Sequence, residues 1–383
     1  MSGLNLQGGF IALHNSLSAG WTSASYPALA REGFMKNPIV HRCVRLISET
    51  AGSMPWLLYE NDVEVEDSDV LHLIRRPNAQ QSRRAFIETI CGHLLLSGNA
   101  YIEAYRLDGD ALPSQIHALR PDCVTVETDE KGWPTGYKVS AGNDHRFIDA
   151  PDDMRMNTVL HLKLFHPLDD QTGFAPLQAA LMALDTHNSA ATWNKALLDN
   201  AARPSGALVY APGDGSNLTP EQYDQLHIEL ERQYSGANNA GKPMILEGGL
   251  DWKAMGLSPK DMDFVETKNG ASRDIALAFG VPPMLLGIPG DNTYANYQEA
   301  NRALFRLTVL PMMARIAEAF SAWLEPAVGR SLRFELDLDQ IDSLNHEREA
   351  LWARLENSTF ITDDEKRMAV GYTPLNNDSE VSR

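Results

Sequence analysis

Two long helical patterns of apolar residues, separated by a break, dominate the last third of the chain. In the first, from about Ser258 to Phe279, apolar residues recur on one face of a helix. Gly280 follows as a helix stop, and Pro282 and Pro283 prevent the helix from continuing. The pattern therefore predicts a helix over residues 258–280 that ends at a glycine.

The break at residues 281–293 is rich in glycine and proline but also contains apolar residues, which predicts a loop with an apolar segment inside it. A second helical pattern runs from Tyr294 to Leu324, within a longer segment of residues 294–330. A helix of that length extends about 46 Å. Pro311 predicts a kink in it, because proline removes a backbone hydrogen bond and crowds the preceding turn.

The first part of the chain combines amphipathic helices with short strands. Residues 1–36 are rich in glycine, serine and alanine with weak periodicity, which predicts an extended or mobile arm. Asn37 and Pro38 then suit the N-cap and the first position of a helix that Gly52 ends. A second amphipathic helix is predicted over residues 82–96. Strands are predicted at residues 56–59, 100–105, 115–126, 137–139 and 159–165.

The middle of the chain predicts one long helix and one compact unit. Residues 176–204 favour a helix whose apolar residues are spread around it, which is typical of packing on several sides. Residues 205–257 predict a strand, a helix and two further strands. Thr219 at the N-cap and Gln222 three positions later form a capping box for that helix.

The tail, residues 331–383, predicts a strand over residues 332–338 and a helix through Leu344 and Leu355, followed by a mostly polar end. Helices and a largely antiparallel sheet thus occur in separate runs along the chain. The predicted fold class is α+β.

Charge limits the function that the chain can have. Acidic residues outnumber basic ones by 51 to 33, which gives a formal net charge of −18. Tight binding to a phosphate backbone requires clustered lysine and arginine, so the charge argues against a DNA-binding module. Two interpretations of the acidity stay open: it keeps DNA from sticking to a wall that DNA passes, or it only confers solubility.

No run of 18 or more apolar residues occurs, and the N-terminus shows no secretion signal, so we expect a soluble chain. The cysteines, Cys43, Cys91 and Cys123, are odd in number and lie within helix or strand patterns. That usage is typical of a reduced, cytoplasmic environment.

Two stretches resemble sites for chemistry, each imperfectly. The loop from Gly236 to Lys242 is one residue short of a phosphate-binding loop, because Pro243 replaces the hydroxyl that would hold magnesium. Asp337 and Asp339 would share one face of a strand and suggest a metal site, but an exposed strand face explains them better. We find no further catalytic or metal-binding motif, which favours a structural or transport role.

The run FGVPPMLLGIPGDNTYANYQEANRALFRLTVLPMMARI, residues 279–316, resembles the most recognisable block of a known family. This is the family of portal proteins of tailed bacteriophages, in the subgroup named after phage HK97, and gene transfer agents use closely similar proteins. Matching blocks occur in the family's order at residues 37–60, 94–106, 173–180, 199–210 and 239–266.

The resemblance implies a portal fold and a division of the chain. The division is a flexible arm at 1–36, a wing at 37–175, stem helices at 176–204 and 258–280, a clip at 205–257, a tunnel loop at 281–293, a kinked channel and wing helix at 294–330, and at 331–383 a C-terminal wing strand and helix with a short or missing crown.

The resemblance also implies function and partners. The family forms a dodecameric ring at one capsid vertex of the virion, assembled in the cytoplasm of the bacterial host. Double-stranded DNA passes through the ring without sequence-specific recognition. The implied partners are the large terminase, a head–tail adaptor and the major capsid protein. No enzymatic activity, cofactor, metal or membrane is implied.

The resemblance assigns candidate sites by position. The expected channel loop is Ile288, Pro289, Gly290, Asp291 and Asn292. Expected contacts with the channel or with a neighbouring subunit are Lys268, Arg273, Tyr294, Asn296, Arg302 and Arg306. Expected residues of the clip, where terminase docks, are Thr219, Gln222, Tyr234 and Lys242. Arg302 and Arg306 share a helix face and would meet either DNA phosphates or, as we favour, acidic groups of the next subunit.

Two alternatives belong to other classes. The first is a soluble nucleic-acid-processing enzyme that uses Asp337 and Asp339 with a metal, or the loop from Gly236 to Lys242 with a nucleotide. Stabilisation by metal or nucleotide would distinguish it. The second is a capsid adaptor that has no bore.

Overall fold

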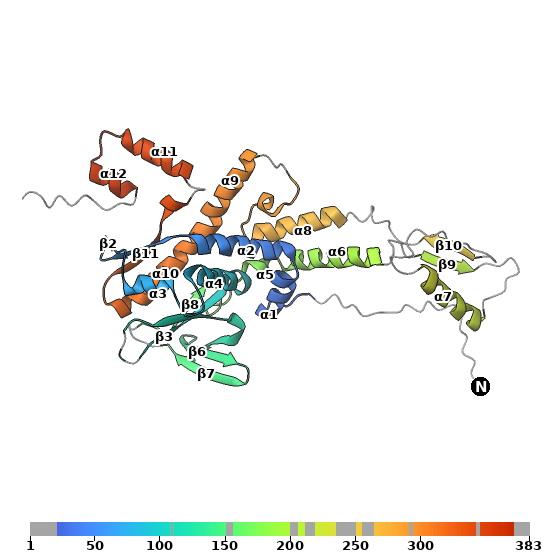
Figure 1. The fold of residues 1–383 in the computed structure, drawn as a ribbon. Helices are drawn as coiled ribbons and strands as arrows, with labels where there is room; N and C mark the ends of the chain where they lie inside the picture. The colour runs from blue at the N-terminus through green and yellow to red at the C-terminus, as the bar shows by residue number, and fades with distance from the viewer. Residues whose placement is uncertain are drawn as a thin grey trace, which may run out of the picture.

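The computed structural model describes the chain as helices and antiparallel sheets. Figure 1 shows a broad body from which two helices project side by side, with a small unit of two strands and a helix beyond their outer ends. This mixture confirms the α+β class. The described residues are 21–107, 109, 111–150, 156–199, 206–210, 219–234, 250–254, 264–290, 294–341 and 345–370.

Two helices that the sequence predicts pack against each other in the body. Helix α2 (Pro38–Ser53) begins at Asn37, whose side-chain oxygen accepts hydrogen bonds from two backbone amides of the first turn. Helix α4 (Arg83–Ser97) ends at Gly98 in the left-handed conformation. The helices approach closely at Gly52, where a Cβ atom would lie 2.9 Å from the carbonyl oxygen of Arg84. Their buried faces begin the main core of the protein.

A three-stranded sheet joins an early and a late segment of the chain. Its order is β11 (Leu332–Leu336), β1 (Trp56–Glu60) and β2 (Val63–Glu64), with all neighbours antiparallel. Trp56 of β1 packs edge-on against Phe320 and Phe334. The C-terminal strand therefore completes a sheet that begins almost 280 residues earlier in the chain.

Two further sheets form the outer part of the body. One has the order β4 (Gln115–Leu119), β3 (Asn99–Tyr105) and β8 (Val159–Lys163), and the other β5 (Val124–Thr128), β6 (Pro134–Ala141) and β7 (Asp144–Asp149). All their pairings are antiparallel, as predicted. The long strand expected at 115–126 is wrong, because a 3₁₀ turn at Pro121–Cys123 divides it. Strand β7 and the helix α3 (Asp69–Arg75) were not predicted.

Two glycines connect this outer part to the projecting helices. A Cβ atom on Gly173 would lie 2.0 Å from the carbonyl oxygen of Gly98, so neither backbone could approach the other with a side chain between them. Asn99 adds a polar link, since its Oδ1 atom accepts a 2.7 Å hydrogen bond from the amide of Gly173.

The projecting pair consists of α6 (Leu181–Asp199) and α8 (Phe264–Ala278), which contact each other along their length (Figure 1). The single helix predicted from residue 176 is interrupted, because α5 (Pro176–Ala179) ends at Ala180, which leaves the helical conformation. A polar cluster holds α6 to α2. Asn37 Nδ2 lies 3.0 Å from His187 Nδ1 and donates a 2.9 Å hydrogen bond to Asn188 Oδ1.

The predicted long C-terminal helix is also divided. It consists of α9 (Tyr294–Leu304), a π-helical stretch η5 (Phe305–Val309) and α10 (Leu310–Val328). Pro311 follows this stretch within a continuous helical backbone, so its missing N–H and its ring disturb the turn before it. The irregularity therefore precedes the proline.

At the ends of the chain, one expectation is wrong and one helix was not predicted. The arm predicted to be extended or mobile up to residue 36 contains α1 (Tyr26–Ala28) and the π-helical η1 (Leu29–Met35), and Leu29 is fully buried in the core. The tail contains a second helix, α12 (Asp363–Ala369), after the predicted α11 (Asn345–Glu356).

The small unit beyond the projecting helices has β9 (Gly206–Tyr210) paired antiparallel with β10 (Leu250–Ala254), and the helix α7 (Pro220–Tyr234). The strand expected at residues 244–247 lies outside the described residues. Among the described helices, none is long and apolar enough to cross a bilayer.

Candidate functional site

The segment between α8 and α9 is the first candidate site, and its backbone is built from turns. Gly280 ends α8 with a φ of 65°, and the amide of Val281 donates a 2.9 Å hydrogen bond back to the carbonyl of Ala276. A 3₁₀ turn, η4 (Pro283–Leu286), follows, and Gly287 reverses the chain with a φ of 72°. The sequence predicted a loop with an apolar segment, and the structure has that loop as a series of turns. We call its residues 281–290 the bracket.

Two side chains hold this bracket at its ends. Thr308 of η5 donates a 2.6 Å hydrogen bond from Oγ1 to the carbonyl oxygen of Gly280. Arg273 of α8 donates a 2.6 Å hydrogen bond from Nη2 to the carbonyl oxygen of Pro289. The bracket is thus tied both to the helix that precedes it and to the π-helical stretch that follows it.

The apolar residues of the bracket face the protein and not solvent. Ile288 is only 5% exposed, and Leu285 and Leu286 pack against the main core. The Ile288 side chain is thus buried within the subunit, and its place in a channel loop stays a prediction. Pro289 and Gly290 are exposed. Asp291 and Asn292 lie outside the described residues.

The remaining channel candidates lie on α8, α9 and η5. Arg302 donates hydrogen bonds of 2.7 and 2.6 Å to the carboxylate of Glu299, so this arginine has an acidic partner in its own chain. Arg306 is exposed but lies in the π-helical stretch, which changes the helix-face relationship predicted for the two arginines. Asn296 is exposed on α9, and the side chain of Tyr294 lies outside the described part.

Lys268 of α8 lies near the polar cluster that joins α6 to α2. The His187 imidazole in that cluster is 2% exposed. Burial lowers the pKa of His187, and the positive charge of Lys268 lowers it further. The histidine is therefore neutral, and Lys268 helps to keep it so.

A groove between α8 and the α5–α6 segment is a second candidate site that the sequence reasoning missed. It has a volume of about 660 Å³ and is lined mainly by small side chains, including Ala179, Ala183 and Ala271. At its rim, Met182 is 69% exposed and Leu277 is 80% exposed. Apolar residues left this exposed beside a shallow, small-residue groove are typical of a surface that another protein covers. The alanines and glycine of both helices were the available signal.

The clip candidates have structural roles where they are described. Thr219 and Gln222 make the predicted capping box, with Gln222 Oε1 accepting from the Thr219 amide at 3.0 Å and Thr219 Oγ1 accepting from the Gln222 amide at 3.3 Å. Tyr234 is the last residue of α7, and its side chain lies outside the described part. Lys242 and the loop from Gly236 to Pro243 also lie outside it.

The carboxylate pair proposed for metal binding is wrong as a strand face. Strand β11 ends at Leu336, and Asp337 instead accepts hydrogen bonds from the Asp339 amide and the Gln340 side chain in a capped turn. Across the described residues, we find no group of histidine, cysteine or acidic side chains able to hold a metal ion.

Comparisons with known proteins agree with this architecture. The family model described as phage portal protein matches residues 38–371. A protein of Rickettsia felis is 40% identical over 90% of this chain and 89% of its own length. The probable portal protein of Streptomyces phage phiC31 is 26% identical, covering 93% of this chain and 79% of its own.

Solved structures extend the likeness to the fold. A chain in the neck of an empty gene transfer agent particle, computed with C6 symmetry, is 48% identical and covers 93% of this chain and 96% of its own, with a TM-score of 0.73. The equivalent chain in the neck of the native particle, computed with C12 symmetry, has a TM-score of 0.70. Because the family model spans most of the sequence and the relatives match nearly its whole length, the chain belongs to the phage portal protein family.

Proposed function

We propose that this chain is the subunit of a ring at one vertex of a DNA-containing particle, through which double-stranded DNA is packaged and later ejected. The observation that carries the proposal is the 48% identity, over 93% of the chain, to a protein in the neck of a gene transfer agent particle. Identity at this level over nearly the full length supports the same position in a related phage or gene transfer agent particle. The family is structural, and we propose no catalysis by this chain.

Twelve copies would make the ring. The groove between α8 and the α5–α6 segment leaves a surface that a neighbouring copy can cover. C12 symmetry was used for the neck of the native gene transfer agent particle. In our proposal, a neighbouring copy covers the exposed side chains of Met182 and Leu277, because a ring of identical subunits buries two different faces of each.

Passage of DNA would depend on geometry and charge, not on sequence recognition. A net charge of −18 per chain repels phosphate and keeps the duplex mobile. The bracket, residues 281–290, would lie near the bore. Its buried apolar side chains would fix its position along the axis of the ring, and Pro289 and Gly290 would form its exposed tip. Residues 205–257 would bind the large terminase and later a head–tail adaptor. The major capsid protein would surround the ring.

A complementation experiment tests this function. A strain that produces the particle is made to lack this chain, and the DNA content of its particles is measured. We expect empty capsids, and DNA-filled capsids once the wild-type chain is supplied. Capsids that fill with DNA in its absence would show that the chain has another role, such as a capsid adaptor without a bore.

A further inference from the structure

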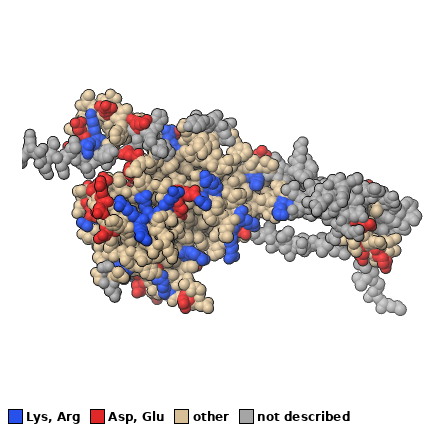
Figure 2. Space-filling view, viewed as in Figure 1, with Lys and Arg blue, Asp and Glu red and all other residues tan. Residues whose placement is uncertain are grey.

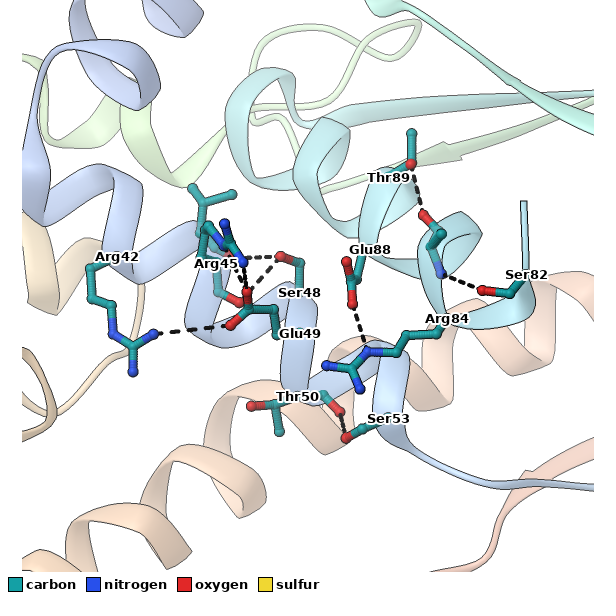
Figure 3. Close-up of polar contacts among 12 residues, drawn as sticks. Arg42, Arg45, Ser48, Glu49, Thr50, Ser53, Ser82, Arg84, Glu88 and Thr89 are labelled. Carbon is teal, nitrogen blue, oxygen red and sulfur yellow. Dashed lines mark hydrogen bonds and ion pairs between the residues drawn. The ribbon is translucent and has the colours of Figure 1, made fainter. Parts of the chain in front are cut away.

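A row of arginines lies on the surface that α2 and α4 share. It consists of Arg42 and Arg45 on α2 and Arg84 on α4, whose side chains are 52%, 54% and 60% exposed. Figure 3 shows them beside the carboxylates of the same helices. We call these three residues the arginine ridge.

The two helices bring the ridge together because they touch at Gly52. A Cβ atom there would lie 3.1 Å from the Cγ atom of Arg84, so the Arg84 side chain crosses directly over α2. A larger residue at position 52 would separate the helices and the guanidinium groups that they carry.

Two of the three ridge arginines, Arg42 and Arg84, keep hydrogen-bond donors for another molecule. Arg84 bonds to Glu88 through Nε alone, at 2.9 Å, which orients the fork formed by its two Nη groups and leaves that fork available. Arg42 Nη1 is 4.0 Å from Glu49, beyond hydrogen-bond range. Arg45 is the exception, because it contacts Glu49 through both Nε and Nη2.

More positive charge lies at the start of α4 and at the end of α3. Arg83 is half-buried, and its pKa is lowered by burial and by the nearby charge of Arg75. Among the described ion pairs, neither Arg83 nor Arg76 has a carboxylate partner. Figure 2 shows basic side chains gathered over α2 and α4, and acidic ones toward β2, on this face. Arg42 and Arg45 share the single carboxylate of Glu49, so the ridge keeps an excess of positive charge that suits an anionic partner.

The pattern of charges favours protein over DNA as that partner. Glu49 and Glu88 stand between the arginines, where they would face the phosphates of a duplex at unfavourable distances. A protein surface that presents spaced carboxylates can match such a mosaic. In a ring, the partner most available is a second copy of this chain, whose excess of acidic residues gives it extensive acidic surface. Identical subunits of charge −18 would otherwise repel one another at each contact.

Resting on the ring of the proposed function, we infer that the arginine ridge is a contact between subunits, which binds an acidic surface of the adjacent copy. The contact joins two different faces, as every interface of a cyclic ring does. It also lowers the repulsion that accumulates when acidic subunits assemble. Its contribution falls as salt screens the charges, over a distance of about 8 Å at physiological ionic strength.

The test is a charge reversal, Arg42→Glu with Arg84→Glu. A control with the same change in net charge, Lys131→Glu with Arg354→Glu, alters exposed residues elsewhere. The full-length proteins are compared by light scattering over a range of protein and salt concentrations. We expect the ridge variant to need at least about tenfold more protein to form rings, because like charges across an interface are strongly unfavourable. The control should assemble as the wild type does.

A milder variant, Arg42→Gln with Arg84→Gln, guards against misfolding, and both ridge variants are checked for native unfolding temperature. It should weaken assembly less than the reversal and make assembly less sensitive to salt. Ridge variants that assemble like the wild type would overturn the inference and leave the ring intact. The same holds if these variants assemble normally and lose only the retention of duplex DNA. A wild-type chain that forms no ring at any concentration would instead contradict the ring itself, and the ridge contact with it.

Discussion

Arg273 and Pro289 are joined by a 2.6 Å hydrogen bond from a guanidinium Nη2 atom to a backbone carbonyl oxygen. The donor lies on α8 and the acceptor at the exposed end of the bracket between α8 and α9. This bond makes the position of the bracket depend on the position of the helix. A displacement of α8 would therefore be transmitted to the segment that we propose to stand beside the bore.

Replacing Arg273 by alanine should loosen the bracket without unfolding the protein. We expect faster amide hydrogen exchange at residues 285–288, whose amides bond within the bracket. The change in the free energy of unfolding should stay below about 1 kcal/mol, since the lost bond is exposed. Arg315→Ala, on the exposed side of α10, is the control and should leave that exchange unchanged. Equal exchange in both variants would show that the bond holds nothing in place.

The close contact of Gly173 with Gly98 predicts a large effect of a single methyl group. Gly173→Ala would place a Cβ atom against a backbone oxygen that cannot move aside, and it should lower the free energy of unfolding by about 2–4 kcal/mol. Gly270→Ala is the matched control. Its Cβ meets nothing within 4 Å, and alanine favours the helix by about 0.5–1 kcal/mol. Chemical denaturation of both variants gives the comparison, and similar values would refute the packing at Gly173.

Asn37 should matter more than an ordinary helix cap. It caps α2 and also contacts His187 and Asn188 of α6 while 1% exposed. Asn37→Ala removes the cap and leaves buried polar atoms without partners, which predicts a loss of about 2–4 kcal/mol. Ser82→Ala removes only the cap of α4 and should cost about 1 kcal/mol. Equal losses would mean that the contact with α6 adds no stability.

Two half-buried histidines predict weaker stability in acid. Burial lowers the pKa of His93 and of His161 to about 4. Each is therefore neutral in the folded protein at a pH where the unfolded chain, with a pKa of about 6.5, takes up a proton. Their contribution to the free energy of unfolding is complete above about pH 6.5, declines as the pH falls, and is lost at about pH 4. The loss is about 3 kcal/mol per histidine.

Unfolding measured as a function of pH tests this sign. His161→Gln removes one titrating group and should flatten the decline between pH 6.5 and 4 by about 3 kcal/mol relative to its own value at neutral pH. A variant that is replaced at the exposed His145 provides the control and should keep the wild-type slope. An unchanged slope in His161→Gln would mean that this imidazole is protonated when folded.

Local patterns predicted the helices at α2 and α4 because capping residues and apolar periodicity act within a few residues. Asn37 and Gly98 mark ends that the chain itself specifies. The pairing of Leu58 with Phe334 could not be predicted in this way, since no local signal sets a register across such a separation. Residues 29–35 were missed because their helix is stabilised by the burial of Leu29 in the core rather than by propensity.

The candidate site shows the same division. Glycines and prolines predicted the loop after α8, but not that Ile288 is buried or that Arg273 ties the loop down, because both depend on tertiary contacts. The arginine ridge likewise requires α2 and α4 to meet at Gly52. Residue types in the sequence indicated the candidate site residues, whereas tertiary packing determines which partners those residues contact.

The proposed function requires that copies of the chain form a ring with a central hole. Negative-stain imaging of the purified protein, combined with light scattering on the same sample, tests it most directly. We expect rings with a hole and a mass near twelve times the 42.4 kDa of one chain. A protein that stays monomeric or dimeric at all concentrations and salts tested, with no rings in the images, would contradict it.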